Sequence, residues 1–270
     1  MATTVQPATG ETTKQLVNYR KDGGVAVIEM CDPPANTYTY EMNRQLDDAI
    51  LRARMENDVY VILLTGAGDK FFSAGANIKM LSSVDPTFKY YFCLHANEML
   101  LRLEHTPKLV IAAINGHCVG GGLEIALICD IRIAAEHARF GCPEVNLGIM
   151  PGWGATQRLT RIIPRAKAAE LIFTGKPINA QEAYRIGLVN EVVPKTELMA
   201  RAQKWAEDLT QVSPLALRAA KEAMIRGYSM PLDEGIKLES ALFSYLLGTE
   251  DFVEGRDAFL NKRKPQFKAK

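Results

Sequence analysis

The sequence predicts an α/β protein in which crossover helices connect parallel strands. Residues 59–65 and 109–114 are short apolar runs, with the length and composition that strands have when both faces of a sheet are covered. A segment with helical spacing separates the two runs, and a glycine-bearing turn follows each of them. This strand–helix–strand order is typical of a sheet whose neighbouring strands run parallel.

The first hundred residues are expected to form a hairpin, a helix, a strand and a second helix. Residues 14–20 and 25–30 alternate apolar and polar side chains around a glycine pair, which is typical of a β-hairpin. Residues 40–55 place apolar side chains at helical spacing and predict an amphipathic helix. An Asp-Pro pair at 85–86 supplies an N-cap and a first-turn proline, so a helix is expected from there to about residue 105.

Beyond the first hundred residues, the expected pattern becomes almost wholly helical from Gly154 onward. Residues 123–128 are expected to form a short helix, and residues 130–135 a further strand. From Gly154 onward, helical segments are expected at residues 155–162, 165–173, 180–186, 197–209, 215–226, 232–247 and 251–261. Residues 232–247 are apolar around more than one face of the helix. Such a helix needs a partner, and the simplest partner is another copy of the same chain.

Composition and charge argue against several classes of function. The chain has 270 residues, of which 47% are hydrophobic and 23% are charged, with a net charge of +1. This balance predicts no nucleic-acid partner and no binding to a membrane surface. No apolar run approaches the ~18–20 residues of a membrane span. Residues 1–13 lack the features of a secretion or transit signal, and we expect them to be a disordered tail.

The cysteines and histidines give no sign of a disulfide framework or a metal site. Five cysteines, an odd number without a Cys-x-x-Cys pair, favour reduced thiols and a cytoplasmic location. Cys142 is interpreted as a small apolar filler, because no histidine lies near it in the sequence. The four histidines have no cysteine or carboxylate at ligand spacing, so we expect no metal and no other cofactor.

Two glutamates, Glu124 and Glu144, each follow a glycine-bearing turn. Glu124 comes directly after a triple-glycine turn at the start of an expected helix, where free backbone N–H groups and the helix dipole favour negative charge. A carboxylate there can move protons while the N–H groups stabilise a developing negative oxygen, which indicates chemistry next to a carbonyl. Taken singly, each has a simpler interpretation: Glu124 as a helix N-terminal charge, and Glu144 as a surface loop residue after proline.

A second glycine turn, Ala74-Gly75-Ala76, follows the first apolar run as the triple glycine follows the second. Two adjacent parallel strands that end in such turns would bring two sets of N–H groups to the same edge of a sheet, where binding crevices form. An oxyanion hole needs two donors of this kind, one from each loop. Either turn alone would be interpreted as a plain glycine turn.

Taken together, these segments resemble the crotonase (enoyl-CoA hydratase/isomerase) superfamily. The resemblance covers about residues 16–267, in the family's order. It rests on Ser73-Ala74-Gly75-Ala76-Asn77-Ile78, Asn115-Gly116-x-x-x-Gly120-Gly121-Gly122-x-Glu124, Phe140-Gly141-x-Pro143-Glu144-x-x-Leu147-Gly148-x-x-Pro151-Gly152, Thr156-Gln157-Arg158-Leu159, Thr174-Gly175, Ala180-x-x-Ala183-x-x-x-Gly187-Leu188-Val189 and Phe259-x-x-Lys262-Arg263-Lys264-Pro265.

The resemblance implies a crotonase-like spiral of repeated ββα units with a C-terminal helical trimerisation region. It divides the chain into the tail at residues 1–13, a core at residues 14–195 with the CoA-binding and active site, and an oligomerisation region at residues 196–270. In the family, the N–H groups that match Ala76 and Gly121 form the oxyanion hole for a thioester carbonyl. The glutamates that match Glu124 and Glu144 act on water, and the presence of both favours hydration over the family's other reactions.

Family analogy also suggests which residues contact coenzyme A. Backbone around Ala74 is expected to meet the adenine, with Asn77, Ile78 and Lys79 nearby; Asn77 replaces the family's usual aspartate. A basic C-terminal segment, often from another subunit, is expected to supply Lys262 to the phosphates and Phe259 to the adenine. The simpler interpretation of Lys262 is a solvated helix end favoured by the dipole.

Trp153 stands where many relatives carry a small residue. If its indole points into the acyl pocket, it favours short acyl chains; the alternative is that it packs against a neighbouring helix.

The resemblance therefore implies an enoyl-CoA hydratase that adds water reversibly to a short trans-2-enoyl-CoA, giving a 3-hydroxyacyl-CoA. The expected partners are an acyl-CoA substrate and copies of the same chain, in a homotrimer or homohexamer. One alternative in the same fold is a specialised hydratase, dehydratase or isomerase of a branched or cyclic acyl-CoA. An alternative of another class is a non-catalytic or RNA-associating crotonase relative, against which the near-neutral charge and the intact glutamate pair both argue.

Overall fold

The computed structural model describes residues 14–270, so the expected N-terminal tail lies outside the described residues. A six-stranded sheet forms its centre, in the order β1-β2-β3-β5-β7-β10. Its strands are β1 (Val17–Asp22), β2 (Val25–Met30), β3 (Val61–Gly66), β5 (Leu109–Ile114), β7 (Ile131–Ala135) and β10 (Glu191–Val193). The β1–β2 pair is the expected antiparallel hairpin, and every other neighbouring pair is parallel.

A second, smaller sheet has the order β4-β6-β8-β9. Its strands are β4 (Phe71–Ser73), β6 (His117–Val119), β8 (Arg139–Gly141) and β9 (Ile178–Asn179). The first three run parallel, and β9 is antiparallel to β8. The sequence pattern did not predict these strands, because two or three residues are too few to show a period.

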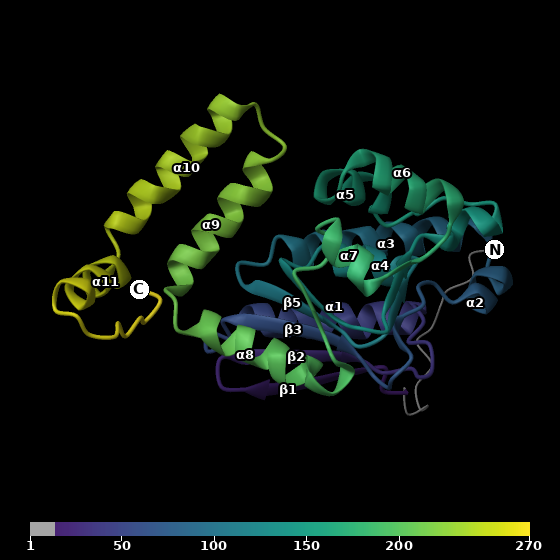
Figure 1. Cartoon of the computed structure of the whole chain (residues 1–270), viewed down its shortest axis with the longest axis horizontal. Coiled ribbons are helices and arrows are strands. Elements are labelled where there is room, and N and C mark those ends of the chain that lie inside the picture. Colours follow the sequence, from purple (N-terminus) through teal and green to yellow (C-terminus); the bar gives the residue numbers. More distant parts are fainter. Residues whose placement is uncertain (1–13) are drawn as a thin grey trace, which may run out of the picture.

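Helices connect and cover the two sheets (Figure 1). They are α1 (Tyr40–Met55), α2 (Ile78–Ser83), α3 (Pro86–Glu104), α4 (Gly121–Leu127), α5 (Ala155–Ile162), α6 (Arg165–Thr174), α7 (Ala180–Arg185), α8 (Leu198–Thr210), α9 (Pro214–Gly227), α10 (Leu232–Leu247) and α11 (Glu250–Leu260), with short 3-10 helices η1 (Pro143–Leu147) and η2 (Lys195–Glu197). The cap predicted for α3 is present, since the Asp85 side chain accepts from the Phe88 N–H at 2.9 Å.

The chain repeats a unit of one strand in each sheet followed by helix. This order occurs in β3-β4-α2-α3, in β5-β6-α4 and, with a 3-10 helix, in β7-β8-η1. The expected α/β spiral of repeated ββα units is therefore confirmed. Successive units stack side by side. The first strands of the units, β3, β5 and β7, are therefore neighbours in the large sheet, and the second strands, β4, β6 and β8, are neighbours in the small one.

Both faces of the large sheet are covered, as the apolar strands predicted. All six residues of β3 are buried. On one face, α8 packs Leu198, Ala202 and Ala206 against the strands. The larger core on the other face draws on α1, α3 and α4. The helix at the start of the 196–270 region thus belongs to the covering layer of the sheet.

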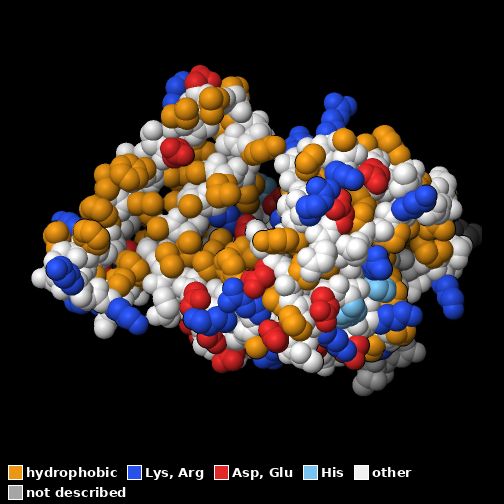
Figure 2. All heavy atoms as spheres, in the orientation of Figure 1, with side chains coloured by type: hydrophobic (Ala, Val, Ile, Leu, Met, Phe, Trp, Pro, Cys, Tyr) orange, Lys and Arg blue, Asp and Glu red, His pale blue; other side chains and the backbone are white. Residues whose placement is uncertain are grey.

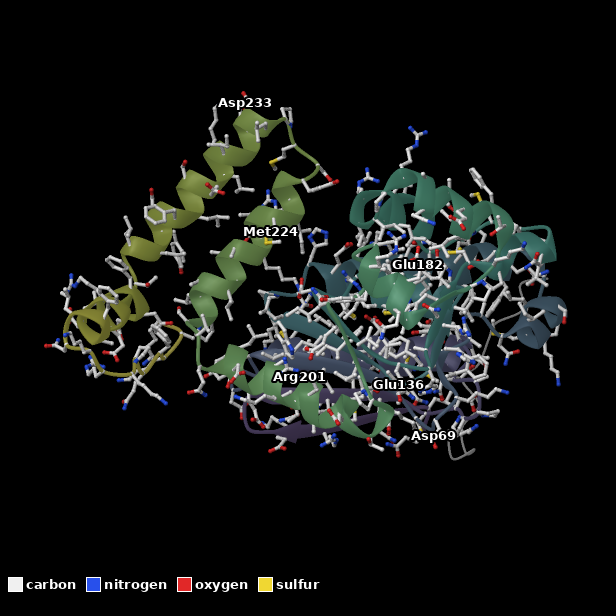
Figure 3. All side chains as sticks on the ribbon, viewed as in Figure 1. Asp69, Glu136, Glu182, Arg201, Met224 and Asp233 are labelled. Atoms are coloured by element: carbon white, nitrogen blue, oxygen red, sulfur yellow. The ribbon has the colours of Figure 1, made fainter. Side chains whose placement is uncertain are left out.

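The three helices that follow α8 project away from this core (Figure 1). None of the residues of α10, all of which the structure describes, is buried. Its exposed apolar side chains include Leu232, Ile236, Phe243, Tyr245 and Leu247. Figure 2 shows hydrophobic side chains gathered over α9–α11, and Figure 3 shows Asp233 at the outer end of α10 while Arg201 lies on the core.

A buried ion pair joins the three projecting helices α9–α11, the C-terminal arm, to the core. Lys221 on α9 lies 2.8 Å from Asp130 at the start of β7 and donates a further hydrogen bond to the Lys108 carbonyl at 2.9 Å. The Lys221 side chain is only 5% exposed.

Among the residues from 14 onward, no helix is long and apolar enough to cross a bilayer.

Candidate active site

Three segments of the site follow three neighbouring strands of the small sheet. The turn at residues 74–76 follows β4, the triple glycine follows β6, and η1 with Glu144 follows β8. Because these strands are parallel, their carboxyl ends lie at one edge of the sheet. As predicted, the two glycine turns come after adjacent parallel strands, β3 and β5, but a short strand of the second sheet stands between each of these strands and its turn.

The first two turns touch at their glycines. A Cβ on Gly75 would lie only 2.7 Å from the Gly121 nitrogen, and a Cβ on Gly122 would lie 2.2 Å from the Ser73 carbonyl oxygen. Gly75 also has a φ of +83°, in the region that favours glycine. Glycine is therefore required here both for backbone conformation and for the close approach of the two loops.

The Ala76 and Gly121 amides are available at this junction. The amides beside them are occupied: Gly75 donates to the Ser73 hydroxyl at 3.1 Å, Asn77 to the Tyr38 carbonyl at 2.9 Å, and Gly120 to the Gly141 carbonyl at 3.0 Å. Within residues 14–270, neither the Ala76 nor the Gly121 N–H has an acceptor. Two unused N–H groups on touching loops are the donors that an oxyanion hole requires.

Glu124 projects from the first turn of α4 and is 2% exposed. Its Oε1 accepts hydrogen bonds from the Trp153 N–H at 2.7 Å and the Ala155 N–H at 2.9 Å. Burial raises the pKa of Glu124 to about 7; the two N–H groups oppose that rise, and the charge of Glu144 adds to it. A carboxyl with this pKa can change its protonation state near neutral pH.

Glu144 lies in the first turn of η1, and its carboxyl faces the triple-glycine turn. A Cβ on Gly120 would lie 3.4 Å from Glu144 Oε1. The other oxygen, Oε2, is buried and has no hydrogen-bond partner among the described residues. Burial raises the pKa of Glu144. The structure thus brings the two predicted acids to the same turn. Two backbone amides hold Glu124, whereas Oε2 of Glu144 has no donor among the described residues.

The Trp153 indole also lies at this turn. A Cβ on Gly121 would be 2.5 Å from Cζ3 of the ring. The ring packs edge-on against Tyr38, with centroids 5.2 Å apart, and against Phe92 of α3 at 5.7 Å. The indole therefore packs on a neighbouring helix and borders the glycine turn, and its effect on acyl-chain length stays a prediction.

The residues expected to contact coenzyme A fall into two groups. Ala74 and Asn77 belong to the first loop, and Ile78 and Lys79 begin α2 directly after it. The Asn77 side chain caps α2 by accepting from the Met80 N–H at 3.0 Å, a structural use that the sequence reasoning missed. Its side-chain amide also donates to the Thr37 hydroxyl at 3.1 Å.

Phe259 and Lys262 lie in and after α11, away from this loop. Figure 1 shows α11 and α2 at opposite ends of the molecule. Phe259 is 83% exposed. Within one chain, the structure does not bring these two residues to the acids.

Two buried asparagines that join the loops were not singled out as site residues. The side-chain amide of Asn36 donates to the Ala67 and Phe71 carbonyls, each at 2.9 Å. Asn115 accepts from the Gly66 N–H at 3.1 Å and donates to the Gly68 carbonyl at 2.8 Å. Asn115 stands in a segment matched to the family pattern, which was the available signal. Only the fold shows that Asn115 connects the ends of β3 and β5 and that Asn36 binds the segment from Ala67 to Phe71.

A cavity lies elsewhere, between α1, the end of α3 and α9. It has a volume of about 590 Å³ and is lined by Arg54, His105, Arg218, Lys221 and Arg226, with Glu222 as its acidic residue. Arg226 and Glu222 pair at 2.8 Å. The two acids and the unused amides, rather than this cavity, identify the site at the glycine turns.

Comparisons with known proteins show the family of this chain. The family model described as Enoyl-CoA hydratase/isomerase matches residues 20–270. The chain is 42% identical to a short-chain-enoyl-CoA hydratase of Clostridium acetobutylicum, over 92% of this chain and 95% of that protein. It is 39% identical to a crotonyl-CoA hydratase of Syntrophomonas wolfei, over 93% of this chain and 96% of that protein.

Solved structures are similar over nearly the whole chain. An enoyl-CoA hydratase from Bacillus anthracis superposes with a TM-score of 0.92 at 37% identity, covering 95% of this chain and all of that one. A structure from Geobacillus kaustophilus gives a TM-score of 0.93 at 40% identity, covering 96% of this chain and 98% of that one.

Proposed function

This chain belongs to the enoyl-CoA hydratase/isomerase family, and we propose that it adds water reversibly to a short trans-2-enoyl-CoA, giving a 3-hydroxyacyl-CoA. It is an enoyl-CoA hydratase, a hydro-lyase. The observation that carries the residue-level proposal is the meeting of Glu124 and Glu144 at the turn that also carries the unused Gly121 amide.

The two amides act on the thioester. When water adds to the β-carbon, negative charge develops on the thioester oxygen, and the Ala76 and Gly121 N–H groups donate to that oxygen. Because both N–H groups lie on loops fixed by close glycine contacts, they need little reorganisation as charge develops. Support comes from their lack of other acceptors within residues 14–270.

The two acids divide the proton transfers. Two backbone N–H groups stabilise the anion of Glu124, so Glu124 is the base that takes a proton from water as the oxygen bonds to the β-carbon. Glu144 is half-buried, its Oε2 lacks a donor among the described residues, and burial raises its pKa, so Glu144 gives its proton to the α-carbon. After product leaves, the proton on Glu124 returns to Glu144 through solvent, which restores the starting state.

Coenzyme A is carried by the substrate, and we propose that no other cofactor takes part, since two amides and two acids supply the groups that hydration needs. The Ala74 backbone, with Asn77, Ile78 and Lys79, forms the near side of the CoA site. Phe259 and Lys262 reach this site from a neighbouring copy, because in one chain they lie at the far end of the molecule.

The assembly is accordingly a homotrimer or homohexamer. The exposed apolar residues of α10 and the projecting arm support association through the C-terminal helices. We place the enzyme in the cytoplasm, a reducing compartment, which suits the five cysteines, all of them free and all within the described part of the chain.

Hydration of crotonyl-CoA, followed by loss of enoyl absorbance, tests the proposal. The wild type should be active, and Glu144→Gln should lose roughly 10²–10⁴ of its rate. Glu136→Gln, an exposed residue on the core, is the matched control and should keep full activity. An inactive wild type would contradict the activity, whereas equal rates in wild type and Glu144→Gln would contradict only the role of Glu144. A panel of acyl-CoAs graded in length and branching then separates the short-chain hydratase from the specialised alternatives.

A further inference from the structure

The turn that supplies Glu124 with its two hydrogen bonds is irregular backbone. It runs from Gly152 to Ala155 and passes through Gly154, whose φ is +107°. Trp153 and Ala155 donate from either side of that glycine to the same carboxylate oxygen. The direction of both N–H groups therefore depends on what holds this turn in place.

Arg158, in the first part of α5, lies directly over the turn. Its Nη1 donates to the Trp153 carbonyl at 3.1 Å. A Cβ on Gly154 would be 2.0 Å from the same nitrogen, so the guanidinium fills the space that any side chain at 154 would need. The left-handed turn and the arginine are thus fitted to one another.

Glu104, the last residue of α3, fixes the guanidinium in return. It accepts from Arg158 Nε at 3.0 Å and from Nη2 at 2.6 Å, the two-point geometry that holds an arginine most firmly. The two side chains are only 15% and 21% exposed. A second contact from the same helix supports the turn, since the Asn97 side chain donates to the Gly152 carbonyl at 3.1 Å.

We propose that Glu104 and Arg158 are a positioning pair for the hydration reaction, which holds the 152–155 turn so that its two N–H groups stay directed at Glu124. The pair touches neither substrate nor the reacting atoms. It acts on the base through the Trp153 peptide, and this inference rests on the proposed role of Glu124. Nothing in the residue pattern required it, because Glu104 and Arg158 are 54 positions apart and meet only in the fold.

Loss of the pair should alter the protonation of Glu124. The charged and titratable groups around this carboxyl are Glu144 from η1, Arg158 from α5, and the thiols of Cys93 and Cys142, whose pKa values burial raises. Only Arg158 among them is a cation. Removing it takes away a nearby positive charge and loosens two N–H donors, and both changes disfavour the carboxylate. The pKa of Glu124 must then rise, and the acid limb of the pH profile must move to higher pH.

The test is the pH dependence of kcat/KM for crotonyl-CoA in Arg158→Gln, Glu104→Gln and the double variant. Each single variant should lose roughly 10²-fold in kcat/KM, as misplacement of a catalytic group by about 1 Å does. Arg158→Gln and the double variant should also show their acid limb at higher pH than wild type. In Glu104→Gln the loss of the Glu104 negative charge opposes that shift, so its acid limb should move less. The double variant should resemble the singles in kcat/KM, because the two residues act as one unit. Arg158→Lys retains the charge but not the two-point contact with Glu104, so its kcat/KM should lie between those of wild type and Arg158→Gln.

Matched controls lie on the same two helices. Arg161→Gln on α5 removes an exposed arginine whose hydrogen bonds go to Gln157, and Glu98→Gln on α3 removes an exposed acid. Both should keep the wild-type limb. Thermal unfolding confirms that each variant is folded; should Arg158→Gln not fold, the double variant and Arg158→Lys give the comparison of acid limbs.

A measurement independent of turnover is the titration of the Glu124 carboxyl by ¹³C NMR in protein with labelled glutamate. The signal of Glu124 is identified by its absence in Glu124→Gln. A raised midpoint in Arg158→Gln supports the positioning role. An acid limb and a midpoint that both coincide with wild type overturn it, even if the rate falls, because the pair would then serve stability alone. An inactive wild type contradicts the hydratase activity instead, so the two failures are distinct.

Discussion

The indole of Trp153 lies against Gly121, so that a Cβ on the glycine would be 2.5 Å from Cζ3 and 2.7 Å from Cε3 of the ring. Gly121 supplies one proposed oxyanion amide, and Trp153 supplies one of the amides that bind Glu124. The contact therefore joins the proposed oxyanion donor to the segment that holds the proposed base. The Trp153 ring leaves no room for a side chain at residue 121.

Gly121→Ala should impair catalysis far more than folding. The new methyl group cannot fit beside the ring, so either the indole or the start of α4 must move, and the Gly121 N–H moves with it. Loss of one oxyanion donor typically costs ~10²–10³ in kcat. Steady-state kinetics on crotonyl-CoA measures the loss. Gly248→Ala is the control, because its Cβ would meet only the Tyr245 carbonyl oxygen at an ordinary 3.6 Å. A Gly121→Ala enzyme with wild-type kcat would contradict the role of this amide.

Trp153→Ala should widen the range of acyl chains. The substitution removes the ring but keeps the backbone N–H that binds Glu124. We expect kcat/KM for long enoyl-CoAs to rise relative to crotonyl-CoA, and unfolding to become easier by ~3–5 kcal/mol because a buried ring is lost. Trp205→Phe, on α8 away from the glycine turns, controls for loss of a tryptophan. An unchanged preference along a graded series would show that the ring does not bound the acyl chain.

The longer helices and strands were predictable from the sequence, because the residues that mark them are close together in the chain. The helix at residues 40–55 and the strand at residues 109–114 have the expected bounds, since apolar spacing and flanking residues mark them. The three-residue strands β4, β6 and β8 were missed, because each exists only through pairing with a partner more than twenty residues away. These short strands determine where the glycine turns lie.

The site was predictable in its chemistry but not in its supports. Glu124, Glu144 and the two glycine turns stand in recognisable segments, and the fold brings them together. The donors to Glu124 come from Trp153 and Ala155, about thirty residues further on, through a turn whose direction no local pattern specifies. Phe259 and Lys262 remain predictions, because their proposed place requires another copy of the chain.

Glu124→Gln should make the protein more stable at alkaline pH. The folded-state pKa of about 7 lies above the ordinary 4.5, so the folded protein binds this proton more tightly than the unfolded one. Stability from this group is present below about pH 4.5 and is lost as pH rises through about 7, by about 3 kcal/mol in all. Glutamine does not titrate and escapes that loss.

Urea unfolding at pH 5 and pH 8, at one protein concentration, measures the effect. The gain in unfolding free energy from Glu124→Gln over wild type should be larger at pH 8, while hydration activity is lost. Glu136→Gln, exposed on the core, should show no such pH-dependent difference. A gain that is the same at both pH values would show that Glu124 does not titrate with a raised pKa.

Phe243→Glu on α10 should separate the copies of the chain and weaken substrate binding together. Phe243 is 60% exposed in the single chain and lies on a helix without any buried residue in the described structure. A charge there opposes burial against another copy, so light scattering should give a mass near the 29.9 kDa of one chain. Met55→Glu, which adds the same charge at a 76% exposed position at the end of α1, should leave the assembly intact. If Phe259 and Lys262 reach the CoA site of a neighbour, KM for crotonyl-CoA rises in Phe243→Glu and not in Met55→Glu. Monomers with an unchanged KM would show instead that each chain binds coenzyme A by itself.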